Sequence, residues 1–185
     1  MESIERSPQR PSLKRSHPVG LRLPALLLVL ALAGHLLSGA PALAAVPSIA
    51  AGHDRSCALS AGGSALCWGN DATGALGDGA AILSRTPLQV TGLSSGVLSV
   101  GTTSAAYHTC AVTIGGAAFC WGNNSAGQLG NGSYAAATVP VPVTGLSSGI
   151  AAIVPGNLHT CALTTAGAIY CWGYNQYGQL GDGTT

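Results

Sequence analysis

Charged residues are scarce in this chain of 185 residues: they make up 7% of it, and Lys14 is the only lysine. From Ala45 onward the only cations are Arg55 and Arg85. A phosphate-binding loop of the Gly-Lys type needs a lysine after its glycines, and a nucleic-acid interface needs a basic surface that two arginines do not form. We therefore expect no such nucleotide loop, no nucleic-acid partner and no cofactor.

Carboxylates are equally rare, because no glutamate follows Ala45 and only four aspartates do. Asp78 and Asp182 recur at one position of a repeated turn, where the copy between them has Asn131. A position that accepts either residue type is typical of a turn, so paired carboxylates for acid–base catalysis are not expected. The sequence also has no Gly-x-Ser-x-Gly nucleophile elbow. We predict that the protein is not an enzyme.

A metal site is not expected either. His108 and His159 each stand two residues before a cysteine, and Arg55 takes that position in the first copy. The cysteines lack zinc-finger spacing, so we interpret the two histidines as repeated structural residues that bond a neighbouring loop.

The N-terminal part has the only long apolar run, Leu23 to Leu37, preceded by five of the seven basic residues. It is followed by Ala42-Leu43-Ala44, a small-x-small pattern typical of signal-peptidase sites. We predict that residues 1–44 are a cleaved export signal and that residues 45–185 are secreted or held in the cell envelope. An uncleaved membrane anchor is the alternative.

A repeat dominates the rest of the chain. Cys57, Cys110 and Cys161 lie 53 and 51 residues apart, and so do Trp68, Trp121 and Trp172. The string "HTCALTTAGAIYCWGYNQYGQLGDGTT" from His159 has close counterparts that begin at His108 and at Arg55. A repeat length of about 50 residues indicates a propeller or an array of stacked units.

Each Cys-x9-Cys segment fits a β-hairpin with a three-residue loop. The loop then ends in Gly63, Gly116 or Gly167, the position at which such turns need a positive φ. The same register places the cysteines opposite one another in a non-hydrogen-bonded pair, close enough for a disulfide. The sequence therefore predicts three disulfides within hairpins 57–67, 110–120 and 161–171: Cys57 to Cys67, Cys110 to Cys120 and Cys161 to Cys171.

Two more short strands complete each unit, one before the hairpin and one after it. The later strand contains Pro87 in one copy and Pro140 and Pro142 in the next, which places it at a sheet edge. Both faces of the third hairpin are apolar, so each sheet needs a neighbour on each side. We predict an all-β fold made of propeller blades with four short antiparallel strands.

His-Thr-Cys-Ala-Leu, Cys-Trp-Gly and Gly-Gln-Leu-Gly-Asp-Gly together resemble the repeat of the regulator of chromosome condensation family, from about Ile49 to Thr185. The resemblance implies a seven-bladed propeller, of which about three repeats are present, so we expect a partial propeller from a longer product. It also implies two candidate activities. One is guanine-nucleotide exchange, as in the nuclear members of the family, and the other is inhibition of secreted hydrolases such as β-lactamases.

The aromatic residues suggest where a partner binds. The repeated tryptophans either form a binding set or pack between blades, and packing is the favoured interpretation. The tyrosines differ between copies and fall near loops, so they are the candidate binding residues: Tyr107, Tyr134, Tyr174 and Tyr177. We predict an exported, non-enzymatic scaffold whose variable loops bind a protein or a glycan.

Overall fold

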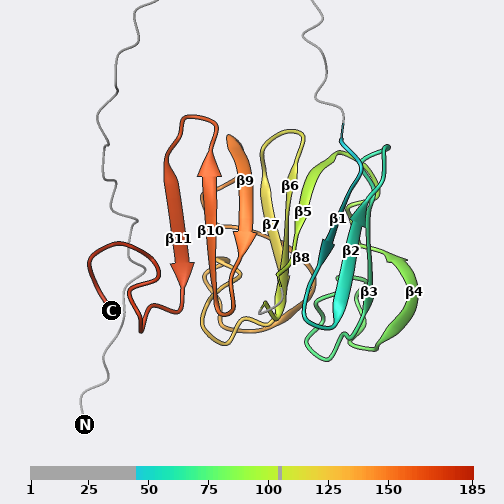
Figure 1. The fold of residues 1–185 in the computed structure, drawn as a ribbon, viewed down its shortest axis with the longest axis horizontal. Helices are drawn as coiled ribbons and strands as arrows, with labels where there is room; N and C mark the ends of the chain where they lie inside the picture. The colour runs from blue at the N-terminus through green and yellow to red at the C-terminus, as the bar shows by residue number, and fades with distance from the viewer. Residues whose placement is uncertain (1–44, 104–105) are drawn as a thin grey trace, which may run out of the picture.

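The protein is all-β, and its strands form three antiparallel sheets that stand side by side like the blades of a propeller (Figure 1). The computed structural model describes residues 45–103 and 106–185, so the predicted export signal lies outside the described residues. No helix in these residues is long and apolar enough to cross a membrane.

Each sheet is a meander in which neighbours along the chain are neighbours in space. The first sheet contains β1 (Ser48–Ala51), β2 (Arg55–Leu59), β3 (Ala65–Gly69) and β4 (Ser84–Gln89). The second contains β5 (Val97–Gly101), β6 (His108–Thr113), β7 (Ala118–Gly122) and β8 (Ala137–Pro142). The third contains β9 (Ile150–Pro155), β10 (His159–Thr164) and β11 (Ile169–Gly173), three strands in the described residues.

The hairpin register is the predicted one. In the first sheet Cys57 lies opposite Cys67, and in the others Cys110 lies opposite Cys120 and Cys161 opposite Cys171. The turn glycines Gly63, Gly116 and Gly167 have φ of 73°, 75° and 84°, which a residue with a Cβ rarely adopts. A short sequence pattern thus determines the central hairpin of each sheet.

The proline-bearing strands β4 and β8 lie at the edges of their sheets, as expected for residues without a backbone donor. Each begins three residues before its first proline, Pro87 or Pro140. Each pairs with its neighbour through a register shift near the tryptophan.

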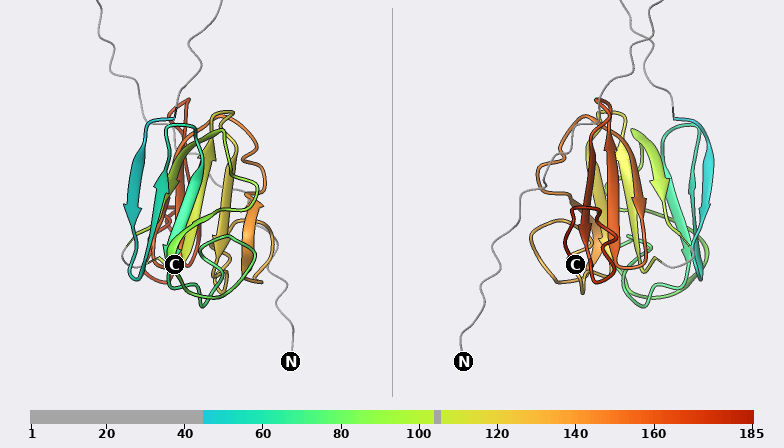
Figure 2. Two further views of the ribbon diagram at one scale, coloured as in Figure 1. Left: turned by 90° about the vertical axis from the view of Figure 1, so that its right-hand side faces the viewer. Right: turned by 60° about the vertical axis from the view of Figure 1, so that its left-hand side comes forward.

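The three sheets are stacked as successive layers (Figure 2), and the apolar core lies between them. Between the first and second sheets, Leu59, Leu76, Val90 and Trp121 are buried together. Between the second and third, Val112, Leu129 and Val143 repeat this arrangement, with Trp172 packed against them. The face of the third sheet directed away from the second is open, since Leu163 and Ile169 there are 41% and 68% exposed.

The meander gives the stack two different ends. Tight turns 61–63, 114–116 and 165–167 lie at one end, called here the hairpin end. The opposite end, called here the long-loop end, carries segments 70–83, 123–136 and 174–185. The connections that precede β2, β6 and β10 lie at the same end.

Candidate functional site

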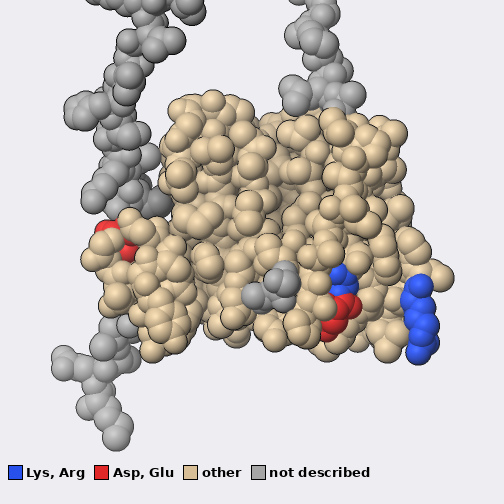
Figure 3. All heavy atoms as spheres, viewed as in Figure 1, with Lys and Arg blue, Asp and Glu red and all other residues tan. Residues whose placement is uncertain are grey.

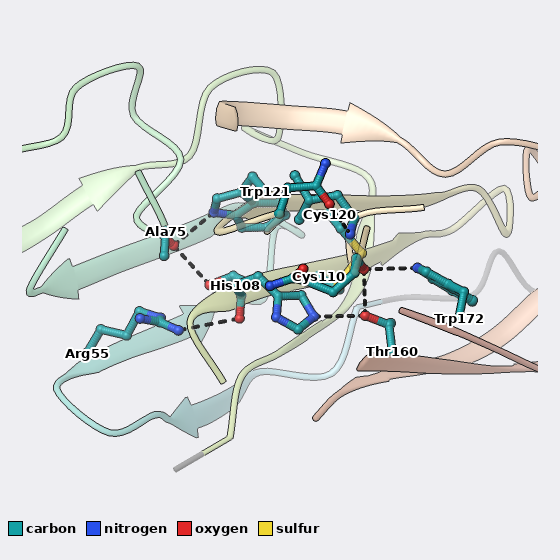
Figure 4. The surroundings of a disulfide bond; sticks show 12 residues. Arg55, Ala75, His108, Cys110, Cys120, Trp121, Thr160 and Trp172 are labelled. Carbon is teal, nitrogen blue, oxygen red and sulfur yellow. Dashed lines mark hydrogen bonds between the residues drawn. A yellow bond between two sulfur atoms is a disulfide. The ribbon is translucent and has the colours of Figure 1, made fainter. Parts of the chain in front are cut away.

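Two of the three repeated tryptophans, Trp121 and Trp172, pack between blades, where each binds a backbone carbonyl of the preceding repeat (Figure 4). Trp121 Nε1 and Thr109 Oγ1 both donate to Ala75 O, each at 2.9 Å. Trp172 Nε1 and Thr160 Oγ1 donate in the same way to Gln128 O, at 2.9 and 2.7 Å. We call this arrangement the inter-blade clasp. Trp68, in the first sheet, is only partly buried.

A glycine beside each clasp makes room for the indole. A Cβ on Gly77 would lie 2.6 Å from Trp121 Nε1, and a Cβ on Gly130 would lie 2.6 Å from Trp172 Nε1. Both glycines also have positive φ, of 77° and 67°. The Gly-x-Leu-Gly string of the sequence therefore serves the packing of blades.

His108 is part of the same interface and lies on β6, with no exposed surface. Its Nε2 lies 2.8 Å from Thr160 Oγ1, whose hydroxyl proton is directed to Gln128 O. His108 Nε2 must therefore carry a proton and donate it. Burial, with smaller effects of Arg55 and His159, lowers the pKa of His108 to about 3. A neutral histidine that bonds the next blade fits the structural interpretation better than a metal ligand does.

Arg55 takes the place of His108 in the first sheet and also reaches the next blade. Its side chain is buried, donates to Ala106 O and His108 O, and lies 3.7 Å from Asp54 Oδ1. The residue equivalent to Arg55 in the third sheet is His159, which is partly exposed. Arg55 and His108 thus connect blades by different donors.

The three disulfides lie in the hairpins, each with a Cα–Cα distance of 4.1 Å: Cys57–Cys67, Cys110–Cys120 and Cys161–Cys171. The first two are fully buried between sheets. All six cysteines are therefore used in cross-links, and no free thiol is present among the described residues.

The long-loop end differs in chemistry from the rest of the surface. All six charged residues of the described chain lie in its loops or at the strand ends beside them, and Figure 3 shows an uncharged surface toward the hairpin end. The predicted tyrosines lie at this end too, since each belongs to one of its segments. Tyr107, Tyr134 and Tyr177 are 48%, 73% and 82% exposed.

Two of the tyrosines line a shallow hollow of about 170 Å³ on the third repeat. Tyr174 and Tyr177 meet edge to face with ring centroids 6.3 Å apart. The rest of the lining is Asn157, Leu158, His159 and Gln179. Tyr107 and Tyr134 belong to the second repeat and lie outside this hollow. The structure therefore puts the four tyrosines at one end of the molecule but not into one pocket.

Comparison with known proteins agrees with this architecture. The sequence profile described as the regulator of chromosome condensation (RCC1) repeat matches residues 115–163, and a second profile of the same description matches residues 150–179. The chain belongs to the regulator of chromosome condensation repeat family. Its sheets resemble the propeller blades of that family.

Two solved structures share these RCC1 blades. Prp20p from Saccharomyces cerevisiae, known for its binding to Gsp1p and histones, superposes with a TM-score of 0.61 at 25% identity, over 75% of this chain and 34% of Prp20p. Human WBSCR16 superposes with the same TM-score and identity, over 69% of this chain and 33% of that protein. This chain thus spans about a third of either protein.

A curated relative is the probable human E3 ubiquitin-protein ligase HERC4. It is 34% identical over 141 residues, which are 76% of this chain and 13% of the ligase. The chain therefore matches only a small part of that enzyme, and the similarity concerns the repeats.

Several functional positions of these RCC1 repeats were not predicted from the sequence. The clasp acceptors Ala75 and Gln128 use backbone oxygens, so no residue type indicates them. Thr109 and Thr160 do recur beside the cysteines and could have been noted as buried donors. Within the described residues there is no cluster of three or more histidine, cysteine, aspartate or glutamate side chains suited to a metal.

Proposed function

We propose that the protein is a non-enzymatic, exported scaffold that binds a protein or glycan through the tyrosines of its long-loop end. The supporting observation is that the tryptophans and the tyrosines occupy different parts of the molecule. The tryptophans recur in every repeat, and Trp121 and Trp172 pack between the sheets, whereas the tyrosines vary between repeats and are mostly exposed at one end. Exposed tyrosines on a rigid frame are typical of binding surfaces.

Export is proposed on two grounds. The six cysteines form three disulfides, which persist in oxidising compartments. Residues 1–44 also have the pattern of a signal peptide. N-terminal sequencing of the secreted protein should find a start near Ala45. A product that keeps Met1 and stays in the membrane fraction would instead support an uncleaved anchor.

The binding proposal is tested with the purified protein and envelope fractions of the source cell. The variant Tyr134→Ser with Tyr177→Ser should retain less than about a tenth of the binding, since exposed aromatic anchors contribute most to such contacts. Ile114→Ser is the matched control, because Ile114 is an exposed apolar residue of the hairpin end. Equal loss in both variants, or no loss in the first, would contradict a tyrosine-based surface.

Inhibition of a secreted hydrolase such as a β-lactamase is one specific form of this binding. Adding the protein to a purified β-lactamase should lower the initial rate of hydrolysis in proportion to the enzyme bound. The Tyr134→Ser, Tyr177→Ser variant should lose this effect. An unchanged rate at a protein concentration that saturates envelope binding would exclude this form and leave the scaffold proposal in place.

Guanine-nucleotide exchange is the competing candidate, motivated by the family resemblance and by the similarity to Prp20p. Acceleration of nucleotide release from a small GTPase by the purified protein would favour it. Among the described residues only Arg85 offers a cation at the surface, because Arg55 is buried. This charge distribution fits an exported binding protein better than a chromatin-associated one.

A further inference from the structure

The three long loops share a side-chain bond that fixes their first turn. Asp71, Asn124 and Asn175 occupy equivalent positions of the repeat. The Oδ1 atom of each accepts a hydrogen bond from a leucine N–H five residues later, at 2.7, 2.9 and 3.0 Å respectively. The same backbone path is therefore kept in all three loops by one acceptor atom.

The second atom of this side chain is a donor in two of the loops. Asn124 Nδ2 donates to Asn131 Oδ1 at 3.2 Å, to Ser133 O at 2.8 Å and to Ala135 O at 3.0 Å. In the third repeat, Asn175 Nδ2 donates to Asp182 Oδ1 at 3.4 Å and to Thr184 O at 3.0 Å. The ends of these two loops thus present oxygen atoms that accept a hydrogen from the amide.

The first loop places a carboxylate oxygen where the others have the amide. Asp71 is 1% exposed, and its Oδ2 has no hydrogen-bond partner in the described part of the chain. Asp78 stands at the position of Asn131, and its Oδ1 accepts from Ala80 N at 3.0 Å just as Asn131 Oδ1 accepts from Ser133 N at 3.1 Å. By equivalence with the other two loops, Asp71 Oδ2 stands where an amide donor would be, and it has no donor of its own unless it carries a proton.

We propose that the first long loop is a proton-operated latch, in which Asp71 binds a proton on Oδ2 and donates it toward Asp78. Protonated Asp71 replaces the asparagine amide of the other two loops and closes the loop. When Asp71 loses the proton, its buried carboxylate lies near the half-buried carboxylate of Asp78, and the loop loosens because like charges repel.

The surroundings of Asp71 favour a proton in mildly acidic conditions. Burial raises the pKa of Asp71 to about 6, and the charge of Asp78 adds to this effect. The hydrogen bond from Leu76 N–H and the charge of Arg55, on β2, act in the opposite direction. The N–H of Ile82 also lowers the pKa, although it is near the carboxyl without meeting the geometry of a hydrogen bond to Oδ2. Asp54, also near Arg55, accepts from Asn70 Nδ2 at 2.7 Å.

The pH dependence of loop closure follows from the direction of this pKa shift. The carboxyl has its ordinary pKa of 3.8 when the loop is open and a raised pKa when it is closed. The closed loop therefore holds the proton more tightly, so protonation stabilises it. This contribution is complete below pH 3.8 and is lost as the pH rises through about 6.

Hydrogen exchange of the full chain tests the latch, with the second loop as an internal control. Protection of the Leu76 amide, corrected for intrinsic exchange, should fall about tenfold between pH 5 and pH 7.5. Leu129 occupies the same position in the second loop, which has asparagines at both sites, so its protection should stay constant. Asp71→Asn should give Leu76 high protection at both pH values.

Three results would overturn the proposal. The first is equal protection of Leu76 at pH 5 and pH 7.5, and the second is an unchanged pH dependence in Asp71→Asn. The third is restoration of protection at pH 7.5 by millimolar calcium chloride, which would show that a cation rather than a proton neutralises the pair. Thermal unfolding of both proteins at both pH values checks that the chain remains folded throughout.

Discussion

The first and second repeats share one frame and differ in two buried polar residues. Both have a hairpin disulfide, a side chain that reaches the next blade and a carbonyl bound by the next repeat's threonine and tryptophan. The first repeat has Arg55 where the second has His108, and Asp71 where the second has Asn124. The first repeat therefore has an arginine and a carboxyl where the second has a histidine that stays neutral and an amide.

This difference shows which parts of the frame depend on side-chain identity. The clasp acceptors are backbone oxygens, so Ala75 serves as well as Gln128. Arg55 and His108 also end on different partners in the next blade, two carbonyls in one case and Thr160 in the other. The frame tolerates a change of donor, but a change of charge makes its stability depend on pH.

The tryptophans should give the largest difference between the repeats. Trp121 is fully buried and makes a clasp bond, whereas Trp68 is partly exposed in this chain. Trp121→Ala should lower the free energy of unfolding by about 3 to 5 kcal/mol. Trp68→Ala should cost less than half as much. Urea unfolding of both variants measures this, and equal losses would contradict the assigned packing.

Removing a disulfide should have the next largest effect. The paired change Cys110→Ala, Cys120→Ala opens a cross-link between residues 10 apart. It should cost roughly 2 to 3 kcal/mol, because a short loop is freed in the unfolded chain. The matched change in the first repeat, at Cys57 and Cys67, should cost the same within error. A large difference would show that the two repeats are less alike than their geometry implies.

The hairpins, disulfides and edge strands of each repeat could be predicted because short-range rules determine them. A Cys-x9-Cys segment whose loop ends in glycine has one hairpin register, and that register gives the disulfide. Proline restricts its strand to a sheet edge. These rules require only the spacing of residues such as Gly116, Cys110 and Pro140, so the repeat could be assigned to blades.

The contacts between repeats could not be predicted in the same way. Trp121 and Ala75 are 46 residues apart, and the acceptor is a backbone oxygen without a sequence signal. The role of Asp71 was also missed, because it becomes visible only when its loop is superposed on that of Asn124. The tyrosines were correctly expected near loops, but the spacing of the repeat did not show that all four share one end.

Asp71 of the first repeat and His108 of the second should change the free energy of unfolding in opposite directions as the pH falls. His108 has its pKa lowered to about 3 in the folded chain, so it stabilises the fold above pH 6.5, and this contribution is lost as the pH falls through 6.5 toward 3. Asp71 acts in the opposite sense between pH 6 and pH 3.8. The unfolding free energy should therefore change little between pH 8 and pH 5.

Replacing the histidine separates the two effects. His108→Gln keeps a donor for Thr160 but removes the titrating ring, so the chain should gain about 1 kcal/mol on going from pH 8 to pH 5. Asp71→Asn should lose a similar amount over the same interval. Urea unfolding at pH 8, 6 and 5 provides the measurement. Parallel pH profiles for both variants would contradict the assignment of opposite signs.

Asn131→Asp should have the smallest effect, and it tests why the latch is confined to the first repeat. The carboxylate Oδ1 can still accept from Ser133 N and from Asn124 Nδ2, as Asp182 does from its equivalents in the third repeat. The change in stability should stay within about 0.5 kcal/mol and show no new pH dependence near 6.

Adding Asn124→Asp to Asn131→Asp puts two carboxylates in the second long loop, as in the first. Exchange of the Leu129 amide should become faster above pH 6 in the double variant alone, since only there does an acceptor face an acceptor. If the single variant Asn131→Asp already behaved in this way, the charge at the turn position, and not the missing amide donor, would be the cause.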